Sequence, residues 1–223
     1  SDYLHKSLAD SKFDSVNIYD CTSQWGVFSI AGPNSRSFLK KIVVSEDPDK
    51  TLSNKEFPWL SYRDIEIGMC PVRALRVAYT GELGWELHHP IEMQNYLLDK
   101  LLRSGKEFNL KLVGARAQNW LRQEKSYKAF GSDLGRDAGP FESKLSRFVD
   151  INKNFLGKDA LLKRKTDVSC VTLLIDGPKD IDPWGREALY NETEDSMLGR
   201  LTSAGYSVPF QRSRGLGYVK SSF

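Results

Sequence analysis

The sequence has few cysteines and histidines and no long apolar run. Its three cysteines lie far apart and form no CxxC pair, which is typical of thiols in a reducing compartment. A structural zinc site needs four closely spaced ligands, and the adjacent His88 and His89 would point to opposite faces of a strand. The longest apolar run, residues 171–175, is far shorter than the roughly 20 residues of a membrane helix. We therefore expect no metal site and no membrane partner.

Neither sign of charge dominates the sequence. The 32 Lys and Arg exceed the 29 Asp and Glu by three, which is too little for a general polyanion binder, so we expect no nucleic-acid partner. A length of 223 residues with 40% hydrophobic residues is typical of one large globular domain or two smaller ones. Residues 1–6 resemble no secretory leader and do not begin with Met, so we expect a piece of a longer protein.

The common catalytic signatures GxGxxG, GxxxxGK[ST], GxSxG and HExxH are also missing. Apolar spacing and turn residues predict the following helices and strands. The helices are expected over residues 1–12, 35–42, 90–103, 115–127, 140–148 and 158–165, with a loop over 46–54. The strands are expected over residues 16–19, 26–30, 72–79, 85–88 and 168–175, followed by short β segments between glycines and prolines.

These elements predict an α+β protein of two parts. The first part, residues 1–165, mixes helices and strands, whereas residues 166–223 have the short, glycine-punctuated segments of a small β-barrel. We place the domain boundary after residue 165, and we find no internal repeat.

The most distinctive segment is YTGELGWE, residues 79–86. Its two glycines predict a hairpin loop whose stems direct Tyr79 and Glu86 toward one cleft, while Trp85 and Leu87 point to the opposite face. A strand carboxylate beside aromatic rings accepts two parallel hydrogen bonds from a planar N–H/NH2 edge, as in pterins and guanidines.

Two other side chains complete this hypothesis. Tyr79 would pack on the bound ring, and Arg116, at the start of a predicted helix, would bind a carbonyl or carboxylate. An exposed strand glutamate, a cross-strand tyrosine and a solvated arginine would explain the same residues, and the residue types alone favour this ordinary interpretation over a binding site.

The remaining polar residues are expected to have ordinary roles. Residues 122–125 are predicted to form a solvated helix face with local ion pairs. Glu142 is predicted to be a first-turn acid favoured by a helix dipole. Arg212 and Arg214 are expected at the surface, and the five tryptophans in the core or at its edge.

Several segments, in order, resemble the glycine-cleavage T-protein (aminomethyltransferase) family. They are residues 29–36 (SIAGPNSR), 78–86 (AYTGELGWE), 114–116 (GAR), 121–124 (LRQE), 131–134 (GSDL), 139–142 (GPFE) and 154–161 (NFLGKDAL). Residues 199–205 and 215–219 resemble the family's C-terminal barrel module. Residues 30–36 and 81–87 look most similar to the folate-binding C-terminal halves of dimethylglycine and sarcosine dehydrogenases.

The resemblance implies a fold of antiparallel sheets with flanking helices and a folate-dependent reaction. In these dehydrogenases a flavin domain oxidises an N-methyl amine to an iminium, and the T-protein-like half transfers the one-carbon unit to tetrahydrofolate. Tyr79 and Glu86 match the family's pterin-binding positions, and Arg116 matches an arginine at the folate site. The implied ligands are tetrahydrofolate and an N-methyl amine, with FAD where a flavin domain precedes. The implied location is cytoplasmic, or the mitochondrial matrix in a eukaryote.

Some family features have no match. The catalytic aspartate belongs to a segment before the point where this sequence starts, so Asp10, Asp14 and Asp20 are not candidates for it. We therefore expect no catalytic residue here, and an inactive chain when it is separated from the intact enzyme. The same resemblance also admits a free-standing aminomethyltransferase, a folate-dependent demethylase or a folate-binding protein of iron–sulfur maturation. A non-catalytic regulatory or folate-binding relative is the alternative of another class.

Overall fold

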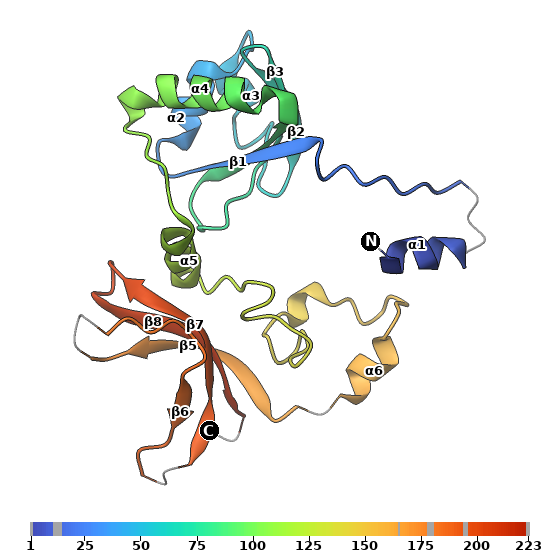
Figure 1. Cartoon of the computed structure of the whole chain (residues 1–223), viewed down its shortest axis with the longest axis vertical. Coiled ribbons are helices and arrows are strands. Elements are labelled where there is room, and N and C mark those ends of the chain that lie inside the picture. Colours follow the sequence, from blue (N-terminus) through green and yellow to red (C-terminus); the bar gives the residue numbers. More distant parts are fainter. Residues whose placement is uncertain (1, 11–14, 165, 178–180, 194–195, 222–223) are drawn as a thin grey trace. The chain divides into compact units, whose positions relative to one another are not determined.

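The computed structural model describes residues 2–10, 15–164, 166–177, 181–193 and 196–221 (Figure 1). Contacts divide the chain into two compact units: unit 1 comprises Ser1–Ala78 and Glu82–Lys111, and unit 2 comprises Tyr79–Gly81 and Leu112–Phe223. Each unit contains helices and one antiparallel four-stranded sheet, which confirms the α+β class. The expected domain boundary after residue 165 stays a prediction.

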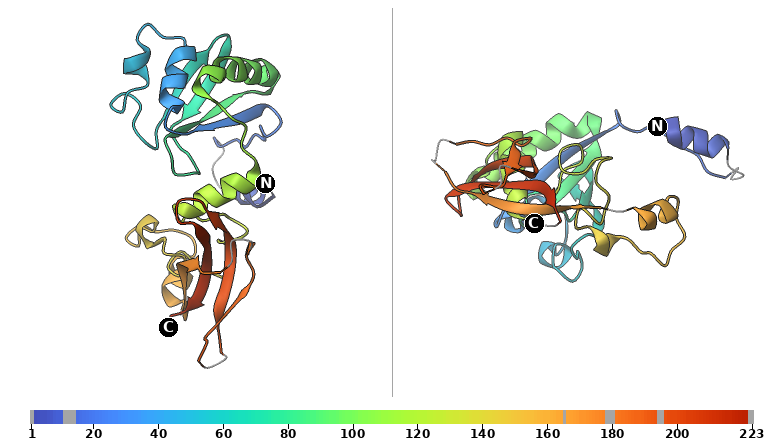
Figure 2. Two further views of the ribbon diagram at one scale, coloured as in Figure 1. Left: turned by 90° about the vertical axis from the view of Figure 1, so that its left-hand side faces the viewer. Right: turned by 90° about the horizontal axis from the view of Figure 1, so that it is seen from below.

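Unit 1 is built on a sheet of strand order β1-β4-β3-β2. Its strands are β1 (Trp25–Ala31), β2 (Tyr62–Ile67), β3 (Cys70–Leu75) and β4 (Gly84–Pro90). Its helices are α1 (Asp2–Ala9), α2 (Ser35–Ile42), α3 (Pro48–Thr51) and α4 (Gln94–Gly105), with 3-10 turns over Ile91–Met93 and Lys106–Phe108. Figure 2 shows the same elements from two further directions.

The core of unit 1 follows from the two periodicities of its elements. In α2, Phe38, Leu39 and Ile42 lie on one helical stripe and are buried, and they pack with the inward residues of the sheet. In β4, alternate residues point inward, which buries Trp85 and Leu87 completely. Helix α4 adds Leu97 and Leu101 to the same core.

Some predictions for unit 1 are confirmed and others are wrong. Helix α2 has the expected bounds, and β1 and β4 cover the expected strands. Strand β2 was not predicted, and residues 16–19 form no strand in the described part of the chain. The expected loop over residues 46–54 contains one helical turn, α3, because the Asp47 carboxylate caps it by accepting a 2.9 Å hydrogen bond from the backbone N–H of Lys50. The predicted first helix is described only from residue 2 to residue 9.

Unit 2 contains a second antiparallel sheet, of order β5-β8-β7-β6. Its strands are β5 (Val168–Ile175), β6 (Ala188–Tyr190), β7 (Met197–Ser207) and β8 (Arg212–Lys220). Its helices are α5 (Ala115–Glu124) and α6 (Lys158–Lys163), with a 3-10 turn over Ser146–Phe148. The described residues give a four-stranded sheet, and the expected barrel is not confirmed.

Helix α5 packs against β7 and β8 and belongs to the same compact unit as the strands (Figures 1 and 2). Strand β5 has the predicted bounds. The helix predicted over residues 140–148 is wrong, because Lys144 adopts a left-handed conformation (φ 58°) that interrupts the helical geometry before the 3-10 turn over Ser146–Phe148. No helix in the described residues is long and apolar enough to cross a membrane.

Candidate functional site

Glu86 lies on the outward face of β4. Its neighbours Trp85 and Leu87 are fully buried on the opposite face, as the alternation predicts, while the Glu86 side chain is 34% exposed. In the sheet register, Ser29 of β1 and Leu75 of β3 stand beside it. The central strand therefore holds this carboxylate in a fixed place and leaves it open to solvent.

His88 is a neighbour of Glu86 that the sequence analysis missed. Its Nε2 lies 3.3 Å from Glu86 Oε2, because residues two apart on a strand share a face. That i, i+2 spacing is the signal that could have identified it. On β3, Arg73 stands opposite His88 and donates from Nε to Asp64 Oδ1 at 2.9 Å. This hydrogen bond lowers the pKa of the Asp64 carboxyl.

Tyr79 belongs to unit 2, and its side chain is partly exposed. Its ring stacks beside that of Tyr127, with centroids 6.4 Å apart and an interplanar angle of 24°. Burial raises the pKa of the Tyr79 phenol, and the nearby Arg122 charge opposes this effect. The hydroxyl is therefore neutral at physiological pH and keeps a proton to donate.

Arg116 is the second residue of α5 and lies among aromatic and acidic side chains. Its guanidinium carbon is 5.1 Å from the ring centroid of Trp120 and 4.8 Å from that of Trp184. Its Nη2 forms an ion pair with the carboxylate of Asp182. The arginine is therefore not a freely solvated side chain, although half of its surface remains exposed.

The three predicted site residues are divided between the units. Tyr79 and Arg116 belong to unit 2 and Glu86 to unit 1. In the described part of unit 2, no hydrogen bond or ring contact joins Tyr79 to Arg116. Of the two loop glycines before Glu86, Gly81 has the expected positive φ (74°). Gly84 instead permits close packing, since a Cβ there would lie 2.6 Å from the carbonyl oxygen of Ile30.

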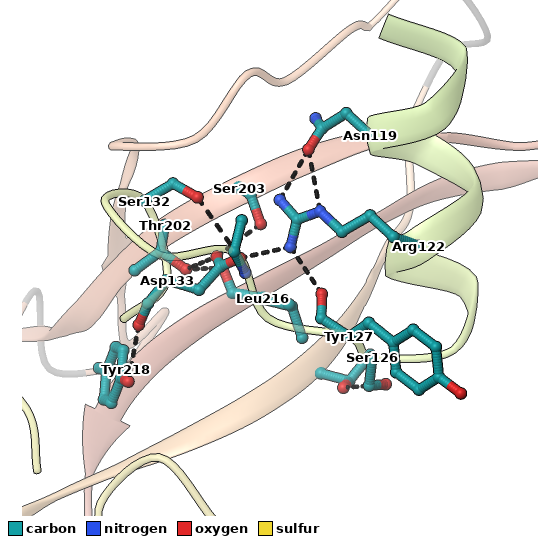
Figure 3. A network of polar contacts seen from close by, with 12 residues as sticks. Asn119, Arg122, Ser126, Tyr127, Ser132, Asp133, Thr202, Ser203, Leu216 and Tyr218 are labelled. Carbon is teal, nitrogen blue, oxygen red and sulfur yellow. Dashed lines mark hydrogen bonds and ion pairs between the residues drawn. The ribbon is translucent and has the colours of Figure 1, made fainter. Parts of the chain in front are cut away.

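A buried polar network is the main feature of unit 2 that the sequence did not reveal (Figure 3). Arg122 was expected on a solvated face, and this prediction is wrong: its side chain is 1% exposed. Its guanidinium forms an ion pair with Asp133 and donates to Asn119 Oδ1 at 2.7 and 3.0 Å and to the carbonyl of Tyr127 at 2.8 Å. Every nitrogen of the fork is therefore satisfied away from water.

Asp133 is the centre of this network. Its carboxylate accepts from Thr202 Oγ1 at 2.5 Å, Ser203 Oγ at 2.6 Å and the backbone N–H of Ala129 at 2.9 Å. Burial acts to raise the pKa of Asp133, but these hydrogen bonds and the Arg122 charge lower it further than burial raises it. The network joins α5 to β7 through one ionised carboxylate and is structural, because both charged side chains are closed to solvent.

Glu142 is also placed differently from the prediction. It is not a first-turn acid, because no helix in the described residues begins directly before it: its side chain is 2% exposed and its Oε1 accepts from Arg164 Nε at 2.6 Å. Arg212 is at the surface as expected, 2.9 Å from Asp176. Arg214 is half-buried, and its Nη1 donates to the carbonyl of Glu124 at 2.8 Å. The described residues contain no group of three or more His, Cys, Asp or Glu side chains that could hold a metal ion.

Comparison with known proteins identifies the family. The family model described as the GCVT N-terminal domain matches residues 1–153. Dimethylglycine dehydrogenase from human mitochondria is 38% identical over 213 residues, which are 92% of this chain and 23% of that enzyme. The aminomethyltransferase of Caldanaerobacter subterraneus is 29% identical over 209 residues, 93% of this chain and 54% of the enzyme.

One solved structure shares the fold. The glycine cleavage system aminomethyltransferase T from Bartonella henselae superposes with a TM-score of 0.67 at 23% identity, over 89% of this chain and 52% of the other. The chain thus spans 23% of the dimethylglycine dehydrogenase and about half of the aminomethyltransferases. Since the GCVT model covers more than half of its residues and agrees with the ordered motifs, this chain belongs to the glycine-cleavage T-protein (GCVT) family.

Proposed function

We propose that this chain binds tetrahydrofolate and serves in the transfer of a one-carbon unit to it. The intact protein would be a flavin-linked enzyme similar to dimethylglycine and sarcosine dehydrogenases. The observation that carries this proposal is the 37–38% identity to mammalian dimethylglycine dehydrogenases along 92% of the chain. The C-terminal position of this chain in the enzyme and the N-methyl amine as donor are parts of the same proposal.

Glu86 is the proposed pterin-binding residue. Its carboxylate is held on a central strand and is 34% exposed, and a carboxylate can accept two parallel hydrogen bonds from a planar N–H/NH2 edge. The strand alternation places the carboxylate on the outward face of the sheet, where His88 Nε2 lies 3.3 Å from its Oε2. The residues present in unit 1 therefore fit a pterin edge.

Tyr79 and Arg116 are the other proposed folate-binding residues. The Tyr79 ring is partly exposed and already stacked on one aromatic neighbour, which suits contact with a flat ligand. Arg116 offers a planar, permanently charged fork that suits a carbonyl or carboxylate. We propose no catalytic residue among these 223 residues.

Their contribution to the reaction would be positioning. Holding the folate nitrogens against the activated one-carbon unit removes much of the entropic barrier to transfer. FAD belongs to this proposal only as the group that oxidises the amine elsewhere in the enzyme. We further propose the mitochondrial matrix as the location in a eukaryote, by analogy with the relatives named mitochondrial, and a domain boundary after residue 165 with the unit 2 sheet as part of a barrel.

A second candidate is a free-standing aminomethyltransferase or folate-dependent demethylase. It is supported by the aminomethyltransferase match along 93% of the chain. The sequence of the complete reading frame distinguishes the two candidates. A dinucleotide-binding GxGxxG segment encoded in the same frame favours the flavin-linked enzyme. A non-catalytic folate-binding relative differs from both by binding folate without transferring the one-carbon unit in the intact protein.

Replacing Glu86 with Gln is expected to weaken tetrahydrofolate binding at least about tenfold, because charge-assisted hydrogen bonds to the ligand are lost. Isothermal calorimetry on the 223-residue chain measures this. Glu66→Gln is the matched control: Glu66 is an exposed acid on the outward face of β2, away from Glu86 in the register. Equal affinities for wild type and Glu86→Gln would contradict the assignment of the pterin to Glu86.

A further inference from the structure

Arg116 contacts three side chains of unit 2. The rings of Trp120 and Trp184 lie 5.1 and 4.8 Å from its guanidinium carbon, and the Asp182 carboxylate pairs with its nitrogen-bearing edge. A guanidinium has two faces that attract aromatic rings and an edge that attracts carboxylates. Arg116 makes both kinds of contact, with Trp120 and Trp184 at its faces and Asp182 at its edge, all from unit 2.

The helix side of this cluster is fixed. Trp120 lies directly against β7, where a Cβ on Gly205 would be 2.1 Å from its ring, so the glycine is needed for this approach. At the end of α5, Ser207 Oγ donates to Glu124 Oε1 at 2.9 Å and Arg214 donates to the Glu124 carbonyl at 2.8 Å. Helix α5 therefore presents Arg116 from a rigid support.

The segment that supplies Asp182 and Trp184 is anchored on both sides. The carbonyl of Ile181 accepts from Ser213 Oγ on β8 at 3.2 Å. The Glu187 carboxylate accepts from the backbone N–H groups of Trp184 and Gly185, at 2.9 Å each. The backbone is therefore held by hydrogen bonds on both sides of Asp182, whose carboxylate forms the ion pair with Arg116.

Within this cluster, the ion pair between Arg116 and Asp182 is the contact that a ligand can most easily replace. Both side chains are partly exposed, 52% for Arg116 and 38% for Asp182, and pairs of this kind contribute little in water. A ligand carboxylate can therefore take the place of Asp182 while both rings keep their contacts with the cation. When that happens, the Asp182 charge opposes the incoming charge.

We propose that Asp182 is an internal stand-in for a ligand carboxylate and that it restrains ligand binding at Arg116. Trp120 and Trp184 would form the aromatic walls of this subsite. Resting on the proposed function, the inference assigns the subsite to the aminobenzoyl-glutamate tail of folate, whose planar ring and carboxylates match the walls and the cation.

Asp182→Asn is expected to tighten binding of N-(4-aminobenzoyl)-L-glutamate about two- to fivefold, since the charged edge of the wild-type arginine is free of Asp182 only in the fraction of molecules whose ion pair is open. The measurement is an NMR titration of the 15N-labelled chain, which follows the indole N–H signals of Trp120 and Trp184. Trp184→Phe assigns one signal by its loss. Tetrahydrofolate should gain affinity by the same factor, and 6-methyltetrahydropterin, which has no carboxylate, should gain none.

Two variants control for charge and for site. Asp159→Asn removes an exposed acid of α6 and should leave the affinity for the tail unchanged. Arg116→Gln should abolish the response of both indoles. If Asp182→Asn binds the tail no better than wild type, or no variant binds it, the inference is overturned. If the tail responds to Asp182→Asn but tetrahydrofolate does not bind, the proposed function fails and the carboxylate subsite stands.

Discussion

Replacing Asp133 with Asn is expected to destabilise unit 2 by about 3–5 kcal/mol, because it leaves the charge of Arg122 buried without its counter-ion. The amide can keep its oxygen toward the Ala129 N–H and the Arg122 fork, but its NH2 group then stands where an oxygen now accepts from Thr202 and Ser203. Thr202 and Ser203 on β7 lose a charged acceptor at the same time. The effect therefore spreads from the 129–134 turn to both α5 and the sheet.

Urea unfolding, combined with hydrogen exchange of the amides in β7, measures this loss. The exchange readout is needed because the two units are expected to unfold separately, and β7 reports on unit 2 alone. Asp137→Asn is the matched control, since Asp137 is 88% exposed and lies 3.5 Å from Arg200. It should change stability by no more than about 0.5 kcal/mol. A loss below about 1 kcal/mol for Asp133→Asn would mean that the network contributes little.

The lowered pKa of Asp133 also predicts how the stability of unit 2 depends on pH. The folded pKa of Asp133 lies below the ordinary value of about 3.9, so the folded state binds the proton less readily than the unfolded state. Its contribution is fully present above that ordinary value and is lost as pH falls toward the folded pKa. The stability difference between wild type and Asp133→Asn should therefore be constant near neutral pH and shrink below about pH 4. A difference that grows on acidification would contradict this sign.

Much of the fold is readable from local patterns. The helix over residues 35–42 and the strand over residues 168–175 have their predicted bounds, because an apolar stripe of one period and clear turn residues define each. The outward placement of Glu86 and the inward placement of Trp85 and Leu87 also follow from alternation alone. Strand β2 has the same alternation, with Ile65 and Ile67 buried and Asp64 and Glu66 exposed, although the sequence analysis did not predict it.

The features that were mispredicted depend on partners distant in the sequence. Arg122 lies in a polar stretch and can be buried because Asp133 neutralises its charge. Asp133 in turn can be buried because Thr202 and Ser203, about 70 residues away, donate hydrogen bonds to its carboxylate. Likewise, Arg116 meets Asp182 across 66 residues. No local pattern encodes these pairings, so the sequence could suggest Arg116 as a candidate site residue without revealing its ion pair with Asp182.

Replacing Trp85 with Ala is expected to destabilise unit 1 by about 3–5 kcal/mol, since this fully buried side chain packs edge-on against Phe57 and leaves a large cavity when it is removed. Trp85→Phe should cost much less, because the indole N–H has no hydrogen-bond partner within the described residues and no bond is lost with it. Hydrogen exchange of the β4 amides measures both changes, and wild-type-like exchange in Trp85→Ala would contradict the core assignment.

Glu86 is adjacent to Trp85 and lies on the opposite face of β4. Glu86→Gln should leave hydrogen exchange of the β4 amides unchanged while weakening tetrahydrofolate binding. If Trp85→Ala lowers stability and Glu86→Gln lowers only the affinity for tetrahydrofolate, then one face of β4 contributes to the core and the other to the proposed pterin contact.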